Sequence, residues 1–290
     1  MAAKICSMTG YAAVTRELPL AVISLELRSV NNRFLDLQFR MPEELRAIEP
    51  AMRERVAARV GRGKVECRIS INANAAAAPA AIDAAALAAL MDLAGRVRAA
   101  APDASGLAVG EILRWPGVVP TQSAAPDLLR ETTLALCAEA LEQFNASRER
   151  EGEKLRGFLL ERADGVAAIV AEVKPKIPAL LAAQREKLTQ RLADAGIAAD
   201  PDRLAQELVL YASKIDVEEE LSRLMAHVEE LRRTVDRGGA VGKRLDFLMQ
   251  EFNRESNTLG SKSVDTRTTQ AAIELKVLIE QMREQIQNIE

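Results

Sequence analysis

The stretch VISLELRSV, residues 22–30, alternates apolar and polar side chains along its length. Alternation with a period of two is typical of a strand that buries one face and leaves the other in water. FLDLQFRMP at 34–42 and KVECRISIN at 64–72 repeat the pattern. The sequence therefore predicts a small sheet with inward-facing Ile23, Leu25, Leu27, Leu35, Leu37, Phe39, Val65, Cys67, Ile69 and Ile71.

A helix is expected between the second and third of these strands. Pro42 precedes two acidic residues, which favours a helix start, and Gly61 favours its end. Residues 73–82 are rich in alanine, and from about residue 83 the apolar spacing is helical. We therefore expect an α+β fold, with a small amino-terminal sheet and a covering helix, followed by a long, predominantly α-helical region.

The net charge of the chain is −3 and its pI is about 5.6, so no overall basic field indicates a nucleic-acid partner. The charge is unevenly placed. Residues 1–72 hold 12 Lys/Arg against 8 Asp/Glu, whereas residues 201–290 hold 13 against 17. One interpretation is a basic front that binds an anion and an acidic back that binds a cation. Ordinary variation in surface charge explains the difference equally well.

Three widely spaced cysteines argue against a disulfide framework and for a reducing compartment. The start of the chain lacks a signal-peptide pattern, and no apolar run approaches 18 residues. We therefore expect a cytoplasmic protein with no membrane partner. Aromatic residues make up only 3% of the chain, so base stacking is not expected to be its main binding device.

The segment DVEEELSRLMAHVEELRRTV, residues 216–235, has an apolar stripe typical of a packed helix. On an ideal helix Asp216, Glu220, Arg223 and His227, the only histidine, lie on one flank of that stripe. Two carboxylates and an imidazole can bind a divalent cation or transfer protons. An exposed ladder of ion pairs would have the same spacing, so this alternative stays open.

The segment LDFLMQEFNRESNTLGSKS, residues 245–263, places Glu251 and Glu255 one turn apart beside its apolar stripe. Carboxylate-bearing flanks that face one another would form a site rather than a surface. The last helix, within 268–290, has a second apolar side at Ile273 and Val277, which suggests a subunit contact.

Basic and amide side chains cluster in RSVNNRFLDLQFRMP, residues 28–42, and in GRGKVE, residues 61–66. Arginine binds phosphate through two parallel hydrogen bonds and lysine binds it as a point charge, so a grip on a nucleic-acid backbone is one interpretation. An asparagine turn flanked by exposed arginines is the other.

Several segments of the chain, taken together, also resemble a known protein family. SMTGY (7–11), VNNRFLDLQFRMP (30–42), RGKVE (62–66) and REREGEKL (148–155) resemble the YicC/YloC family of bacterial endoribonucleases, as do DVEEELSRLMAHVEE (216–230) and nearly everything from 242 to 290. The resemblance implies a cytoplasmic, ring-like hexamer that cuts RNA with support from a divalent metal. One position departs from it, because Asn32 stands where we expect relatives to carry histidine.

Chemistry and resemblance together give the expected function, a metal-assisted endoribonuclease of bacterial RNA turnover that uses Mn²⁺ or Mg²⁺. The alternative is a non-catalytic RNA-binding adaptor or scaffold oligomer that presents RNA to another nuclease. The expected partners are RNA, further copies of the chain and other RNA-degrading proteins.

The expected site residues fall into three groups. The catalytic candidates are His227, Glu251, Arg254 and Glu255. The metal candidates are Asp216, Glu220, Glu251 and Glu255. The RNA-binding candidates are Arg28, Asn31, Arg33, Arg40, Arg62, Lys64 and Lys262. The expected organisation is a basic amino-terminal α+β domain with a helical extension (1–155), a helical connector (156–205) and an acidic carboxy-terminal helical domain (206–290).

Overall fold

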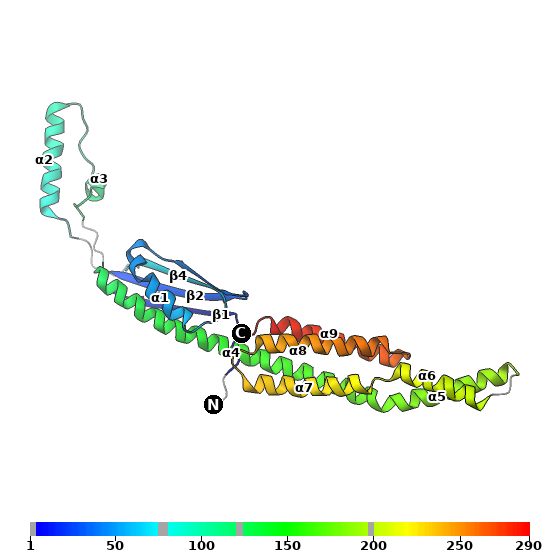
Figure 1. Ribbon diagram of the computed structural model, residues 1–290. Helices are drawn as coiled ribbons and strands as arrows, with labels where there is room; N and C mark the ends of the chain where they lie inside the picture. Colours follow the sequence, from blue (N-terminus) through cyan, green and yellow to red (C-terminus); the bar gives the residue numbers. More distant parts are fainter. Residues whose placement is uncertain (1–3, 75–80, 120–123, 197–199) are drawn as a thin grey trace.

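The computed structural model describes residues 4–74, 81–119, 124–196 and 200–290. The molecule is elongated, with the sheet in its middle, a bundle of helices at one end and a separate helical unit at the other (Figure 1). No described helix combines the length with the apolar character that a membrane crossing requires. Cys6, Cys67 and Cys137 are all free, as the sequence predicts.

The expected sheet is confirmed and has four strands in the order β1-β2-β4-β3. Its strands are β1 (Gly10–Glu17), β2 (Ala21–Val30), β3 (Leu35–Arg40) and β4 (Gly63–Ala73). β2 pairs antiparallel with β1 and β4, while β3 runs parallel to β4. β1 was not predicted, because the side chains that it buries, Ala12 and Val14, are too small to give a clear alternation.

The covering helix differs from the expected one. A 3₁₀ turn, η1 (Glu43–Ile48), leads into a shorter helix, α1 (Glu49–Ala57). The reason is Pro50, which lacks the N–H that an unbroken helix from Pro42 would need at that position. Both segments still pack on the sheet, where Leu45 and Met52 are fully buried.

The dominant element is α4 (Pro126–Val173), a single helix of 48 residues. Its first half packs on the sheet through Leu136, Ala140 and Phe144, and its second half packs on the carboxy-terminal helices through Leu159 and Val166. The helix therefore belongs to both hydrophobic cores. Residue 155, the expected end of the first domain, lies inside it, so a rigid element rather than a linker joins the two parts.

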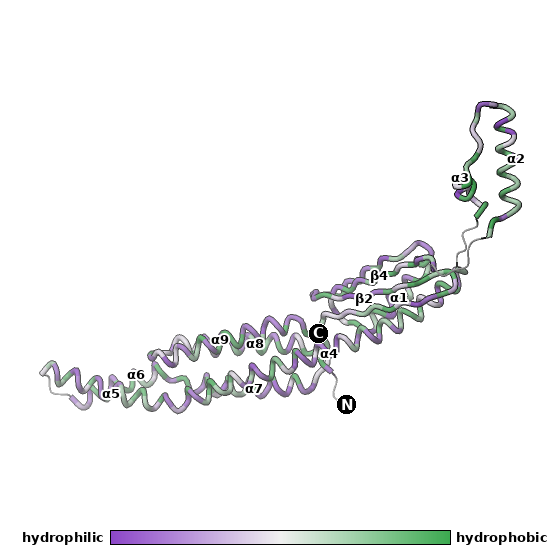
Figure 2. The backbone as a smooth tube through the Cα atoms, turned by 180° about the vertical axis from the view of Figure 1, so that it is seen from behind, coloured by the Kyte–Doolittle hydropathy of each residue, from purple (hydrophilic) through white to green (hydrophobic). Residues whose placement is uncertain are grey.

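The carboxy-terminal bundle consists of α4 with α7 (Glu218–Arg237), α8 (Gly242–Ser261) and α9 (Thr266–Ile286). Hydrophobic and hydrophilic segments alternate along these helices, as one-sided burial requires (Figure 2). The expected apolar stripes are buried, namely Leu221, Leu224, Val228, Leu231, Val235, Leu245, Leu248, Met249, Phe252, Leu275, Ile279, Met282 and Ile286. A short turn, η2 (Lys174–Lys176), leads to a hairpin of α5 (Ile177–Asp194) and α6 (Pro201–Ile215) that extends beyond the bundle (Figure 1). The separate unit holds α2 (Ala84–Ala100) and α3 (Val109–Arg114).

Residues 6–8 and 288–290 meet where the sheet adjoins the bundle (Figure 1). Met8 donates its backbone N–H to the carbonyl of Asn288 over 2.7 Å, and Glu290 donates to the carbonyl of Cys6 over 3.0 Å. This junction fixes the sheet against the helices on which the acidic candidates lie.

Candidate functional site

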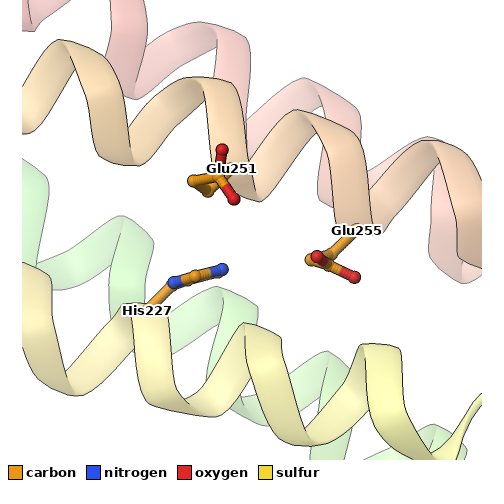
Figure 3. Close-up of side chains that lie close together, drawn as sticks. All are labelled: His227, Glu251 and Glu255. Atoms are coloured by element: carbon orange, nitrogen blue, oxygen red, sulfur yellow. The ribbon is translucent and has the colours of Figure 1, made fainter.

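His227 on α7 faces Glu251 and Glu255 on α8 across the interface between the two helices (Figure 3). One potential ligand atom from each of the three lies within 4.8 Å of the others. The two glutamates are one turn apart, so both carboxylates lie on the side of α8 that faces the imidazole. Among the described residues this is the one group of at least three carboxylate, imidazole or thiol side chains with such spacing.

Burial makes this group costly in the absence of a ligand. The side chain of Glu255 is only 3% exposed and that of Glu251 is 28% exposed. The Nε2 atom of His227 is buried and has no hydrogen-bond partner among the described residues, and the imidazole ring meets the ring of Phe252 edge-on at 5.6 Å. Buried polar atoms are nearly always paired, so the unpaired nitrogen beside two carboxylates makes this group a candidate ligand site.

Arg223 is the cation in direct contact with the buried carboxylate. Its Nη1 lies 3.4 Å from Glu255 Oε1, while Nη2 bonds the exposed Glu219 on the same helix. The expected catalytic arginine, Arg254, is farther away, at 3.9 Å from Glu251, and is 68% exposed. The helical spacing placed Arg223 on the same flank as His227, but sequence reasoning did not assign it to the site.

Two expected metal ligands lie outside this group. Asp216 ends α6 instead of belonging to α7, and its carboxylate accepts the backbone N–H of Glu218 over 3.3 Å. The observed helix α7 therefore begins at Glu218, two residues after the start of the ideal helix that was assumed for 216–235. Glu220 is buried and accepts a 2.9 Å hydrogen bond from Lys262. Lys262, which was expected to contact RNA, therefore forms an ion pair within the protein.

The donor set of the remaining three residues fits one of the two expected ions better. Mg²⁺ prefers oxygen ligands throughout, whereas an imidazole nitrogen with carboxylate oxygens also suits Mn²⁺. His227, Glu251 and Glu255 would supply three ligands and leave the other coordination positions of the ion open.

Farther along the interface between α7 and α8, a 3.0 Å hydrogen bond from Arg244 holds the pKa of Glu230 below its usual value.

Four of the expected RNA-binding cations gather at one end of the sheet. The register pairs Val30 with Lys64 and Leu35 with Gly63, so the end of β2 and the starts of β3 and β4 adjoin one another. Arg28, Arg33, Arg62 and Lys64, which we call the basic sheet end, lie there and form no ion pair among the described residues. Arg40 lies at the other end of β3 and pairs with Glu66 at 2.9 Å.

Asn31 has a structural role at the same place. Its Nδ2 donates to the carbonyl of Gln287 over 2.7 Å, so it ties the loop after β2 to the end of the chain. The first residue of α8, Gly242, also contacts the end of the chain, because its N–H donates to the carbonyl of Glu290 over 3.2 Å. From Gly242 to Glu251 is nine residues along α8, which is about 14 Å at the rise of an α-helix.

Comparisons with known proteins match both parts of the chain. A family model described as "Endoribonuclease YicC-like, N-terminal region" matches residues 5–157, and one described as "Endoribonuclease YicC-like, C-terminal" matches residues 173–290. The "Probable endoribonuclease YicC" of Haemophilus influenzae is 43% identical over 99% of this chain and 100% of its own length. The protein of the same name from Clostridioides difficile is 29% identical over 98% of this chain and 99% of its own length.

Proposed function

The chain belongs to the YicC-like endoribonuclease family, and from this membership we propose that it is an endoribonuclease that cleaves RNA phosphodiester bonds with the help of a divalent metal ion. The single observation that supports the metal is the group formed by His227, Glu251 and Glu255, with its unpaired buried nitrogen. Of the two expected ions, Mn²⁺ accepts an imidazole nitrogen beside carboxylate oxygens more readily than Mg²⁺ does.

Each residue of the site would have a separate role. Glu251, Glu255 and His227 hold the cation between α7 and α8. When bound, the ion supplies positive charge that polarises a phosphate oxygen. Arg223 is half-exposed at the edge of this group, and its guanidinium can donate to phosphate oxygens as negative charge develops on them. Arg254, on the exposed side of α8, can orient the RNA strand.

RNA would be held by the basic sheet end. Arg28, Arg62 and Lys64 form no ion pair among the described residues, so contacts with phosphates would not require them to leave a carboxylate. Arg40 and Lys262 would have to leave Glu66 and Glu220 to do so. Contacts of this kind position the strand without reading its sequence.

The test is cleavage of an end-labelled RNA by purified protein with Mn²⁺ and with EDTA. We expect Glu251→Gln to abolish cleavage and to remove the stabilisation that Mn²⁺ gives to the parent protein. The matched control is Asp246→Asn, an equal loss of charge on the exposed side of the same helix, which should cleave normally. Cleavage at the parent rate by Glu251→Gln would place the catalytic centre elsewhere.

One contact favours the second candidate, a non-catalytic RNA-binding adaptor that presents RNA to other degrading proteins. The guanidinium of Arg223 already neutralises part of the charge of Glu255, as it would in a purely structural ion pair. In that case the parent protein would bind RNA, show no stabilisation by Mn²⁺ and cleave nothing after further purification.

We also propose that the protein acts as a homo-oligomer, a hexamer by resemblance, in bacterial RNA turnover in the cytoplasm. In support, Ile273 and Val277 on α9 are each 51% exposed, which leaves an apolar strip available for another subunit. Val277→Asp should dissociate such an assembly, which sedimentation velocity would detect as a loss of mass.

A further inference from the structure

Phe34 is a large apolar side chain that the fold leaves in water. It lies between β2 and β3 and is 70% exposed. Single exposed apolar residues are common on protein surfaces and need no function by themselves. The surroundings of Phe34, however, differ from those of an ordinary exposed side chain in two respects, the rigidity of its loop and the charge around it.

Hydrogen bonds at successive residues hold the loop in place. Asn31 Nδ2 donates to the carbonyl of Gln287 over 2.7 Å, Asn32 Oδ1 accepts the N–H of Arg33 over 3.0 Å, and the carbonyl of Phe34 accepts the N–H of Gly63 over 3.3 Å. Gly63 has a φ of +112°, a conformation that few other residues adopt. The fold therefore fixes the backbone of this loop while the ring points away from both cores.

The charge around the ring is that of the basic sheet end. The guanidinium of Arg33 lies 5.3 Å from the centroid of the Phe34 ring, and Arg62 and Lys64 flank Gly63, whose N–H bonds to the carbonyl of Phe34. None of these cations forms an ion pair among the described residues. The carboxylate of Asp36, which lies opposite Lys64 in the strand register, accepts from Gln38 over 3.4 Å. An aromatic surface beside cations that form no ion pair among the described residues matches a polyanion that carries flat, apolar bases.

We propose that Phe34 is the stacking surface for one unpaired RNA base, with Arg33, Arg62 and Lys64 holding the phosphates next to it. In a duplex each base is already stacked between its neighbours, so only an unpaired base can lie on the ring. The inference rests on the proposed RNA-binding function and adds selectivity for unpaired nucleotides. A low aromatic content argues against stacking as a general device, but a single ring at a fixed position is enough for one base.

The experiment measures fluorescence anisotropy of labelled RNA in EDTA, so that cleavage does not interfere. The probes are a 12-nucleotide oligoadenylate, the same strand with one central abasic position, and a 12-base-pair RNA duplex. We expect Phe34→Ala to weaken binding of the single strand about tenfold, a loss typical of one stacked base, and to change duplex binding less than twofold. Phe34→Trp should retain the affinity of the parent. Lys64→Ala should weaken binding of all three probes, because it removes a phosphate contact.

The control for exposed aromatic area is Phe247→Ala, which removes a 59% exposed ring from α8 and should leave binding unchanged. Equal binding of the single strand by Phe34→Ala and by the parent would overturn the inference and leave RNA binding itself intact. Failure of the parent to bind any probe would overturn both the inference and the proposed function. A lower sedimenting mass for Phe34→Ala would also overturn the inference, because the ring would then be a contact between subunits.

Discussion

The guanidinium of Arg148 and the carboxylate of Glu290 form an ion pair where four segments of the chain meet. Arg148 lies on α4 and is 1% exposed, and its Nε donates to the carbonyl of Ser7 over 2.7 Å. The second carboxylate oxygen of Glu290 accepts the N–H of Gly61 over 2.7 Å. The pair therefore ties the long helix to both ends of the chain and to the turn before β4, next to the basic sheet end.

Removing one partner of this pair should be costly. Arg148→Met leaves the carbonyl of Ser7 and the carboxylate of Glu290 without their main donor, and the loss of one partner of a buried pair typically costs about 3–5 kcal/mol. We expect a loss of about 3 kcal/mol in the free energy of unfolding, measured with urea. Arg150→Met, on the exposed side of the same helix, is the control and should change stability by less than ~0.5 kcal/mol. Similar midpoints for the two variants would contradict this role of Arg148.

A second prediction compares two glycines of α4. A Cβ atom at Gly152 would lie 2.0 Å from the carbonyl oxygen of Ile5, whereas one at Gly157 would meet nothing within 4 Å. Gly157→Ala should therefore stabilise the helix by up to about 1 kcal/mol. Gly152→Ala should push the segment around Ile5 away from α4 and lower the melting temperature clearly. If both variants melted at or above the temperature of the parent, the close approach of Ile5 to α4 would be wrong.

Local patterns account for what the sequence could predict. The apolar stripes of α7, α8 and α9 recur at every helical turn, and the alternation in β2 and β4 recurs every two residues. Each of these elements can therefore be predicted without knowing which element it packs against. The small side chains of β1 carry no such repeat, and the effect of Pro50 depends on a single missing N–H.

The candidate site shows where local reasoning ends. The helical wheel for 216–235 correctly placed His227 on the flank beside the packing stripe, but it could not show that Asp216 lies before the helix begins. Which carboxylates face His227 depends on the rotation of α8 about its axis, and that is set by packing between helices. Pairing of Lys262 with Glu220, and of Arg223 with Glu255, likewise has no signal in the sequence.

A third prediction concerns pH. Because the hydrogen bond from Arg244 lowers the pKa of Glu230 in the folded protein, this pair stabilises the fold above the usual pKa of a glutamate, and the contribution is lost as the pH falls through the lowered value. Arg244→Gln should therefore reduce stability at neutral pH and have little effect near pH 3. Urea midpoints at the two pH values measure the difference. Arg237→Gln, which removes an exposed arginine of α7 that forms no ion pair within the described part of the chain, is the control. An equal loss at both pH values would mean that Arg244 acts through packing rather than charge.

The last prediction follows from the position of Arg223 against the proposed metal ligands. A cation that binds Glu255 must share this buried carboxylate with the guanidinium of Arg223, which lies 3.4 Å from it, and two positive charges on one carboxylate repel each other. Arg223→Ala should therefore bind Mn²⁺ more tightly than the parent, by about fivefold, since an ion pair with one exposed partner contributes roughly 1 kcal/mol. The same change should slow RNA cleavage, because the phosphate loses a donor at the edge of the site.

Opposite effects on metal binding and on cleavage distinguish this role from a structural one. Titration calorimetry with MnCl₂ in the absence of RNA gives the metal affinity, and the gain in melting temperature on adding Mn²⁺ should be larger for Arg223→Ala than for the parent. Arg223→Lys keeps the charge and should stay close to the parent in metal affinity. Arg237→Ala removes an exposed positive charge from the same helix and corrects for the change in net charge. If Arg223→Ala bound Mn²⁺ no more tightly than Arg237→Ala, Arg223 would not compete with a metal ion for Glu255, and the contact between them would be an ordinary ion pair between helices.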